Sequence, residues 1–259
     1  MAIVECVNAS FAYDGRTVLD NLNFQVGEGD YLCIVGENGS GKTTLMNGIL
    51  GLMRPRTGAI SFGDGLESTQ IGYLPQHNSA HQSFPASVYE VVLSGRLNSR
   101  GILPFFSKED KEIAHDVMDT LGIMPIRKKS FMELSGGQQQ RALLGRALCA
   151  TKKALLLDEP ATGLDPLVTR ELYATIQSLS KNMGITIIMI SHDVRAAVEY
   201  SSHILHLKNR QVFFGTVDEY KQTDVGKLFL SGGWSFESEK HDSELLAHAT
   251  GGEEHDSIV

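Results

Sequence analysis

The sequence predicts an α/β fold built around a largely parallel sheet. Residues 31–35 form a β-rich run that enters a glycine-rich loop. Residues 154–157 and 185–190 are continuous apolar runs, which are typical of parallel strands buried on both faces. A helical pattern over residues 166–181 lies between these two runs, as expected for a strand, helix, strand unit. With 259 residues and 42% hydrophobic content, the chain can bury one large core.

Two regions depart from this α/β pattern. The N-terminal third contains further β-rich runs at residues 3–7 and 22–26, separated by turn residues. Between about residues 77 and 153 the pattern becomes helical, so we predict a helical subdomain inserted into a main domain of residues 1–230. Within it, Ser107 is a candidate N-cap for a helix over residues 108–121. The apolar face of that helix is formed by Ile113, Val117 and Leu121.

The composition excludes several classes of protein. The net charge is −8, and seven acidic residues against one lysine in residues 231–259 leave the rest of the chain nearly neutral. A nucleic-acid binder needs clustered basic residues instead. No apolar run approaches the ~18 residues that span a bilayer, and no apolar segment opens the chain, so we expect a soluble cytoplasmic protein with a flexible acidic tail. Cys6, Cys33 and Cys149 are scattered among apolar residues, which favours reduced, partly buried thiols.

The glycine-rich loop carries the first functional motif. It fits G-x-x-x-x-G-K-[ST], follows a predicted strand and opens a predicted helix, as a phosphate-binding loop does. Backbone N–H groups of such a loop curl around phosphate oxygens, Lys42 adds a positive charge at the β- and γ-phosphates, and Thr43 offers a hydroxyl to Mg²⁺. The candidate ATP-binding residues of this segment are Gly36, Glu37, Asn38, Gly39, Ser40, Gly41, Lys42, Thr43 and Thr44.

Two carboxylates follow the apolar run at residues 154–157. Asp158 and Glu159 stand at the C-terminal end of this predicted strand, which is where ligands of open α/β sheets bind. Asp158 is placed to hold the Mg²⁺ shell. Glu159, one residue further out, can accept a proton from an attacking water.

The segment Leu-Ser-Gly-Gly-Gln at residues 134–138 identifies the family that this chain resembles. It stands about twenty residues before the carboxylate strand, and we expect it to cap a helix over residues 139–150. With the phosphate loop and the carboxylate pair, it closely resembles the signature motif of ABC (ATP-binding cassette) ATPases. The resemblance spans about residues 2–230 and implies a P-loop NTPase cassette with a RecA-like core, an N-terminal antiparallel β subdomain and an inserted α-helical subdomain.

The resemblance assigns roles to further positions. The signature residues that cover the partner's ATP are Ser135, Gly136, Gly137 and Gln138. Gln76 is similar to the Q-loop glutamine, which serves in catalysis and as an Mg²⁺ ligand, and Asp165 to the D-loop aspartate. His192 resembles the switch histidine, and Tyr13 the aromatic residue that stacks on adenine, although Phe11 lies two positions away. The one departure is residues 161–163, where Ala-Thr-Gly replaces a more usual pattern of Ser and Ala.

The same resemblance implies partners and cargo. ABC cassettes pair head to tail around two ATP molecules, so it implies a homodimer that drives a polytopic membrane permease from the cytoplasmic face of the plasma membrane. The pattern from Gln76 through Phe84, Pro85 and Ser87 to residues 88–92 resembles zinc- and manganese-uptake ATPases, which work with a metal-binding extracytoplasmic protein. The ATPases of iron-complex or cobalamin importers, and a stand-alone soluble ABC regulator, remain alternatives. No nucleic-acid partner is expected.

Two further hypotheses concern surface segments. The region 77–106 offers Phe84, Leu97, Phe105 and Phe106, and we predict that it receives a cytoplasmic helix of the permease. In the tail, histidines spaced seven residues apart either form a weak zinc or manganese sensor or are simply solvated. These histidines are His241, His248 and His255.

Overall fold

The computed structural model describes residues 1–63, 65–76, 85–99, 105–151 and 153–231. The tail histidines His241, His248 and His255, and Phe84 of the predicted permease surface, lie outside these residues. Of the described helices, none is long and apolar enough to span a bilayer. Cys6, Cys33 and Cys149 are free and buried, as predicted.

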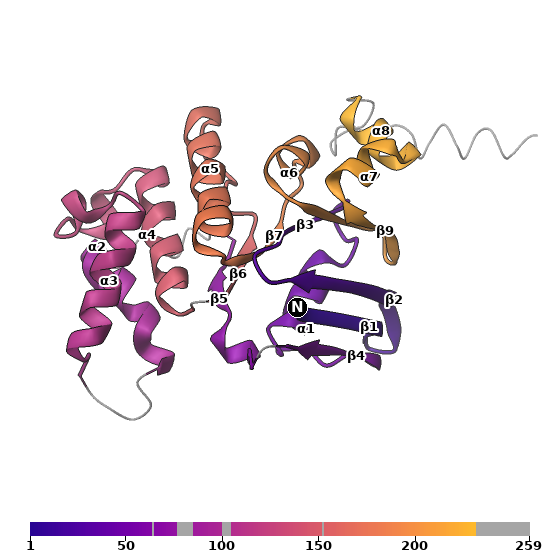
Figure 1. Ribbon diagram of the computed structural model, residues 1–259, viewed down its shortest axis with the longest axis horizontal. Helices are drawn as coiled ribbons and strands as arrows, with labels where there is room; N and C mark the ends of the chain where they lie inside the picture. The colour runs from indigo at the N-terminus through magenta and orange to yellow at the C-terminus, as the bar shows by residue number, and fades with distance from the viewer. Residues whose placement is uncertain (64, 77–84, 100–104, 152, 232–259) are drawn as a thin grey trace, which may run out of the picture.

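Two β-sheets form the body of the molecule (Figure 1). The first is a three-stranded antiparallel sheet in the order β2-β1-β4, made of β1 (Ala2–Tyr13), β2 (Arg16–Gly27) and β4 (Thr57–Phe62). The second has six strands in the order β5-β6-β7-β3-β8-β9, of which only the β8–β9 pair is antiparallel. Its strands are β3 (Tyr31–Val35), β5 (Gly72–Leu74), β6 (Ala154–Asp158), β7 (Thr186–Ile190), β8 (His203–Leu207) and β9 (Gln211–Thr216).

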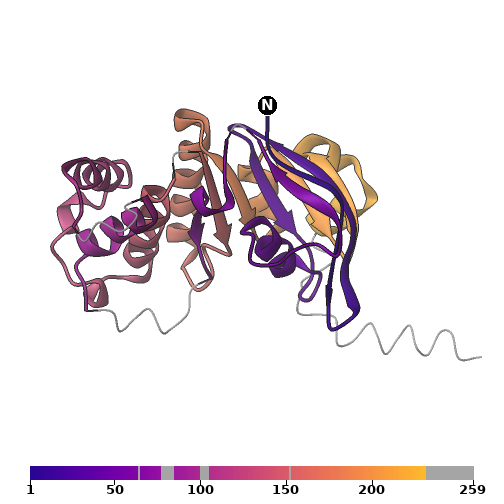
Figure 2. The ribbon, with the colours of Figure 1, turned by 90° about the horizontal axis from the view of Figure 1, so that it is seen from below.

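The helices fall into three groups. At one end of the molecule, α2 (Val88–Leu93), α3 (Lys108–Thr120) and α4 (Gly136–Cys149) form a helical lobe, which both ribbon views place away from the antiparallel sheet (Figures 1 and 2). The other helices are α1 (Lys42–Ile49), α5 (Pro166–Met183), α6 (Val194–Tyr200), α7 (Val217–Gln222) and α8 (Asp224–Leu230). Short 3₁₀ turns include η1 (Ser68–Gln70), η3 (Ser94–Ser99), η4 (Met124–Ile126) and η5 (Phe131–Glu133).

The six-stranded sheet separates two hydrophobic cores, and this explains its continuous apolar strands. On β6, Leu155 and Leu157 face the core shared with the helical lobe and α5. Leu156, between them, faces the core shared with α1 and the antiparallel sheet. Successive side chains of a strand point to opposite faces, so a strand covered on both sides needs an apolar residue at every position.

Hydrogen-bonded N-caps set where the helices of the lobe begin. Ser107 accepts from the backbone of Asp110 and starts α3, as predicted. The helix expected over residues 139–150 instead begins at Gly136. The prediction was three residues late because Ser135 is the N-cap and forms a capping box with Gln138, which fixes the two glycines in the first helical turn.

Candidate active site

Four segments that carry sequence-predicted residues end at one edge of the six-stranded sheet. Strands β5, β6, β7 and β3 are parallel neighbours, so their C-terminal ends lie side by side. Gln76 follows β5, Glu159 follows β6, His192 follows β7, and the phosphate loop follows β3. The C-terminal edge of a parallel sheet is where open α/β folds bind ligands.

The phosphate loop joins β3 to the N-terminus of α1 and holds its lysine inward. Lys42 is buried, and its Nζ donates to the carbonyl oxygens of Gly36 at 2.7 Å and of Glu37 at 2.9 Å. Gly36 has φ of 150°, and a Cβ there would lie 2.3 Å from the carbonyl oxygen of Leu207, so only glycine fits. Burial lowers the pKa of Lys42, while the carboxylates of Glu159, Asp158 and Glu37 raise it.

The carboxylate pair lies beside this lysine. Asp158 is the last residue of β6, pairs with Ile190 of β7, and is 9% exposed. Burial, followed by the charge of Glu159, raises the pKa of Asp158 to about 6, although the positive charge of Lys42 opposes the shift. Two carboxylates and one ammonium group therefore share a partly desolvated site, in which another cation would be stabilised.

The carboxylate of Glu159 is the point where the other segments meet. Its Oε2 accepts from Nε2 of Gln76 at 2.9 Å and lies 3.4 Å from Nδ1 of His192. Glu159 itself has φ of 46°, the left-handed region that a non-glycine residue seldom adopts. Its backbone N–H donates to the carbonyl of Ile190 at 3.1 Å, which anchors this conformation to β7.

Sequence reasoning missed one contact of this carboxylate. Thr162 donates its hydroxyl to Oε2 of Glu159 at 3.1 Å. The residue lies in the segment 161–163, which we noted only as a departure from the usual pattern. A hydroxyl three residues after a candidate base was the available signal, because a turn brings such residues together, and here the N–H of Thr162 also donates to the carbonyl of Glu159 at 3.2 Å.

The signature residues form a separate, exposed surface. Ser135 and Gly136 are exposed at the N-terminus of α4. A cavity of about 210 Å³ opens beside them, between α4, α5 and the segment 122–126. Two of its lining residues, Arg141 and Glu171, form an ion pair at 2.6 Å. Within the described residues, no hydrogen bond or ion pair joins the signature residues to the phosphate loop.

Two further predicted residues lie at exposed positions. Asp165 is the N-cap of α5, and its Oδ1 accepts from the N–H groups of Leu167 and Val168 at 3.0 and 3.1 Å. Tyr13 ends β1 and is 48% exposed, whereas Phe11 is fully buried in the core. Of these two aromatic residues, only Tyr13 is accessible to a ligand.

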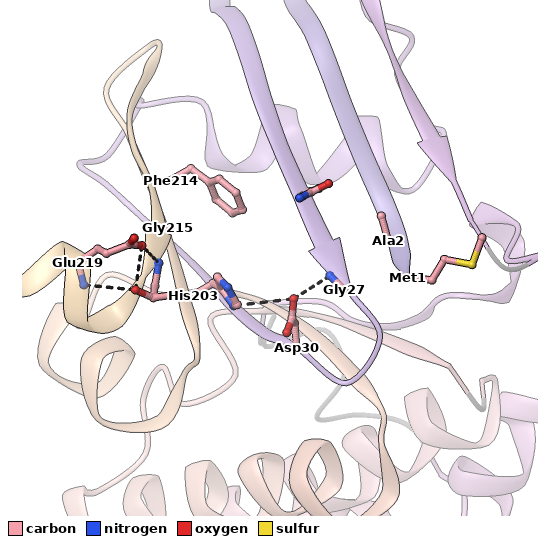
Figure 3. A pocket seen from close by; sticks show the side chains of 10 residues that line it. Met1, Ala2, Gly27, Asp30, His203, Phe214, Gly215 and Glu219 are labelled. Atoms are coloured by element: carbon pink, nitrogen blue, oxygen red, sulfur yellow. Dashed lines mark hydrogen bonds and ion pairs between the residues drawn. The ribbon is translucent and has the colours of Figure 1, made fainter.

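Another cavity among the described residues lies elsewhere. Its volume is about 440 Å³, and it opens between the start of β8 and the antiparallel sheet, beyond the N-terminal end of β3 (Figure 3). Both carboxylates of this cavity have hydrogen-bond partners. Oδ2 of Asp30 accepts from the N–H of Gly27 at 2.7 Å and lies 3.8 Å from Nδ1 of His203. The carboxylate of Glu219 accepts from the N–H and the hydroxyl of Thr216. The phosphate loop follows the opposite end of β3, so this cavity is not part of the candidate active site.

The fold, with a glycine-rich loop after β3 and a carboxylate pair after β6, defines a P-loop NTPase cassette. Comparison with known proteins narrows the class. The profile of the ABC transporter family matches residues 19–162. The zinc uptake system ATP-binding protein ZurA of Listeria monocytogenes is 35% identical over 225 residues, covering 85% of this chain and 88% of ZurA. The manganese transport system ATP-binding protein MntB of Bacillus subtilis is 37% identical over 234 residues, covering 87% of this chain and 93% of MntB.

Solved structures agree with this placement. A proposed metal-chelate type ABC transporter in an inward-facing conformation superposes with a TM-score of 0.79 at 29% identity, covering 90% of each chain. The protein cbiO1 of Clostridium perfringens, part of the ABC transporter complex cbiONQ, gives a TM-score of 0.76 at 28% identity and covers 95% of this chain and 99% of its own. The chain belongs to the ABC transporter family, as an ATP-binding subunit with ATPase activity coupled to transport.

Proposed function

We propose that this chain hydrolyses Mg²⁺-ATP in a head-to-tail homodimer and thereby drives uptake of zinc or manganese through a membrane permease. The observation that carries the catalytic part is the convergence of Gln76 and His192 on the carboxylate of Glu159, next to Asp158 and Lys42. The chain would act as a peripheral subunit on the cytoplasmic face of the plasma membrane.

The phosphate loop supplies the nucleotide site. On binding, Lys42 exchanges the carbonyls of Gly36 and Glu37 for the β- and γ-phosphates. Backbone N–H groups of the loop and the N-terminus of α1 stabilise the phosphate charge. The exposed ring of Tyr13 stacks on adenine.

The residues around the carboxylate pair fit Mg²⁺. The hydroxyl of Thr43, the carboxylate of Asp158 and the amide oxygen of Gln76 form an all-oxygen donor set of the kind that Mg²⁺ prefers. A divalent cation would also offset the like charges that raise the pKa of Asp158 to about 6. When bound, Mg²⁺ would supply positive charge that stabilises the negative charge developing on the phosphates.

Glu159 is the proposed general base. It accepts a proton from the water that attacks the γ-phosphate. Within the described residues the contacts from Gln76, Thr162 and His192 are all made to Oε2, which leaves Oε1 to accept this proton. We propose that His192, whose side chain is 51% exposed, turns to the γ-phosphate.

The homodimer follows from the separation of the two half-sites. Ser135, Gly136, Gly137 and Gln138 present a capped helix N-terminus to solvent, which is suited to an anion. In a two-fold arrangement this surface covers the γ-phosphate held by the partner's phosphate loop, and Asp165 lies at the joint.

The names of relatives support the cargo. ZurA is a zinc uptake ATP-binding protein and MntB a manganese transport ATP-binding protein. Such a system also implies a metal-binding extracytoplasmic protein that delivers the ion. One observation favours a second candidate: a structurally similar transporter is of the metal-chelate type, so an iron complex or cobalamin is the alternative cargo.

Metal uptake tests the proposal. The chain and a candidate permease from the same genome would be expressed in cells that lack their own zinc and manganese importers, and accumulation of radioactive zinc, manganese and an iron chelate would be compared. We expect uptake of one divalent ion with the wild-type chain and none with Glu159→Gln. Uptake of the chelate alone would establish the alternative cargo, and failure to co-purify with any polytopic membrane protein would contradict the transport role.

The permease contact is proposed for the surface that follows the Q-loop. Leu97 of η3 is 54% exposed and Phe105 is 83% exposed, although Phe106 packs against the core. Large exposed apolar side chains of this kind mark interaction surfaces. Cysteines placed at 97 and 105 should crosslink to a cytoplasmic helix of the permease, with a cysteine at Val212 of β9 as the exposed control. Crosslinks found only at 212 would exclude this docking surface.

A further inference from the structure

The turn between β8 and β9 contacts the phosphate loop from behind. Its central residue, Asn209, has φ of 54°, a left-handed conformation that asparagine tolerates better than most residues. Lys208 donates its N–H to the carbonyl of Arg210 at 2.9 Å and closes the turn. The chain just before it, at Leu207, is where Gly36 of the loop packs without space for a side chain.

Asn209 is hydrogen-bonded to two segments far away in the sequence. Its backbone N–H donates to the carbonyl of Ser40 at 3.1 Å, and its Nδ2 donates to the carbonyl of Gly39 at 3.2 Å. The same Nδ2 donates to the carbonyl of Val18 on β2 at 3.3 Å, while the carbonyl of Asn209 accepts from the N–H of Asp20 at 3.2 Å. One residue thus connects the phosphate loop to β2.

These bonds set the direction of the loop's peptide groups. In a planar trans peptide the carbonyl of one residue and the N–H of the next point in opposite directions. With the carbonyl of Ser40 held toward Asn209, the N–H of Gly41 is directed away from the turn. The carbonyl of Gly39 is held in the same way by the asparagine amide. The N–H of Gly41 lies at the N-terminus of α1, where phosphate oxygens bind.

The neighbouring ion pair contributes little to this arrangement. Nζ of Lys208 lies 3.8 Å from Oε1 of Glu37, and the Lys208 side chain is 63% exposed. Exposed ion pairs of this kind contribute little because water screens them. Asn209 holds the phosphate loop instead through two directed hydrogen bonds, one from its backbone N–H at 3.1 Å and one from its side-chain amide at 3.2 Å.

We propose that Asn209 is a positioning residue for ATP binding. Asn209 holds the carbonyls of Gly39 and Ser40 toward the β8–β9 turn and connects them to β2. In this way it keeps the phosphate loop in its binding geometry before the nucleotide arrives. It touches no phosphate itself. Because the loop binds phosphates in both the ground state and the transition state, loss of the amide should weaken ATP binding without slowing the chemical step.

The decisive variant is Asn209→Gly, which keeps the left-handed backbone and its main-chain bonds but removes the Nδ2 donor. We expect KM for ATP and the calorimetric Kd of ATP to rise by roughly three- to tenfold, about the effect of losing the one Nδ2 bond that reaches the phosphate loop, with kcat within about twofold of wild type. Asn209→Asp, which keeps the side-chain length but places a carboxylate against two carbonyls, should weaken binding at least as much.

Asn8→Gly is the matched control. Asn8 also has positive φ, of 48°, lies in β1, and its side chain makes no hydrogen bond within the described residues. Asn8→Gly should leave the KM for ATP unchanged, even if it lowers the free energy of unfolding as much as Asn209→Gly does. An unchanged KM and Kd in Asn209→Gly, a fall in kcat alone, or an equal rise in KM in Asn8→Gly would overturn the assignment.

Because Asn209 acts through the ATP site proposed above, Lys42→Ala serves as the reference variant. If Lys42→Ala weakens ATP binding and Asn209→Gly leaves the Kd of ATP unchanged, the positioning role is wrong and the site stands. If Lys42→Ala also binds ATP normally, the proposed ATP site itself is wrong, and the positioning role is wrong with it.

Discussion

One half of this chain carries the phosphate loop and the other carries the signature segment. Both halves use the same physical arrangement, but it is buried in the first half and exposed in the second. Both place glycines at a helix N-terminus, where N–H groups and the helix dipole attract an anion. In the first half Lys42 is buried, hydrogen-bonded to the loop and surrounded by packed strands. In the second half Ser135 is exposed, and its capping bonds are long, at 3.3 and 3.4 Å.

This difference indicates which half can bind nucleotide without a partner subunit. The phosphate loop is hydrogen-bonded from behind by Asn209 and lies beside Asp158, so groups of the same chain support its geometry. The signature helix offers one side of an anion site, and within the described residues no hydrogen bond joins it to the phosphate loop. We therefore expect nucleotide affinity to reside in the first half and turnover to require the second half from a partner subunit.

The largest expected effect comes from blocking the second half. In Ser135→Arg, a long side chain would occupy the place of the partner's γ-phosphate, so steady-state ATPase activity should fall below detection. The Kd of ATP for the monomer should stay at the wild-type value, because Ser135 makes no contact with the phosphate loop in its own chain. Ser135→Ala, which keeps the space open, is the control. If Ser135→Arg weakened monomer binding as much as Lys42→Ala does, the division into two halves would be refuted.

Removing the base in the first half should have the next largest effect. Glu159→Gln keeps the shape of the side chain but cannot accept a proton, so hydrolysis should fall by about two to four orders of magnitude while ATP binding survives. Single-turnover assays at saturating ATP measure this directly. Turnover at the wild-type rate would show that another group is the base.

The same variant tests whether the halves meet. With ATP bound but not hydrolysed, Glu159→Gln should sediment as a dimer and return to a monomer when ATP is removed, because the sandwich needs both nucleotides as part of the interface. The addition of Ser135→Arg to this variant should prevent dimerisation. A Glu159→Gln chain that stayed monomeric with ATP, even together with its permease, would contradict the head-to-tail arrangement.

Loss of the lysine should have a smaller effect, confined to binding. Lys42→Ala removes a charged donor to the phosphates, and we expect the Kd of ATP to rise roughly 10- to 100-fold. Calorimetric titration of ATP into the monomer provides the measurement, with Lys227→Ala on α8 as an exposed-lysine control. A normal Kd in Lys42→Ala would mean that the loop does not hold the nucleotide.

The smallest effect concerns the stability of the strand behind the loop. His206 on β8 pairs with Val35, is buried against Phe229 and is hydrogen-bonded through Nδ1 to Tyr220 at 2.9 Å. Burial, with smaller contributions from the charges of Lys208 and Lys42, lowers the pKa of His206 to about 4. The histidine of the unfolded chain binds a proton near pH 6.5, whereas His206 of the folded chain binds one only near pH 4. The free energy of unfolding should therefore fall as the pH decreases from 6.5 to about 4.

Urea unfolding measures this pH effect. Between about pH 7.5 and about pH 5, His206 should account for a loss of about 2 kcal/mol in the free energy of unfolding. His206→Gln keeps a partner for Tyr220 but does not titrate, so its loss over the same range should be smaller by that amount. Equal losses in the two proteins would show that His206 does not titrate on unfolding.

The chemical motifs could be predicted from the sequence alone. The phosphate loop, the pair Asp158 and Glu159, and the signature segment were each predictable because their residues are contiguous, so spacing along the chain already fixes their local geometry. The same holds for Ser107 as a helix cap, since its partner Asp110 lies only three residues away. Burial on both faces also explains why the central strands are mostly apolar.

Contacts between residues that are far apart in the sequence could be seen only in the tertiary structure. Gln76 reaches Glu159 because β5 pairs with β6, and Asn209 reaches the phosphate loop because β8 pairs with β3. Periodicity and turn signals specify strands but not their order in a sheet, since that order depends on the packing of all layers together. For the same reason the sequence could not tell that Phe11 is buried and Tyr13 exposed, as both lie in one strand and differ only in what packs against them.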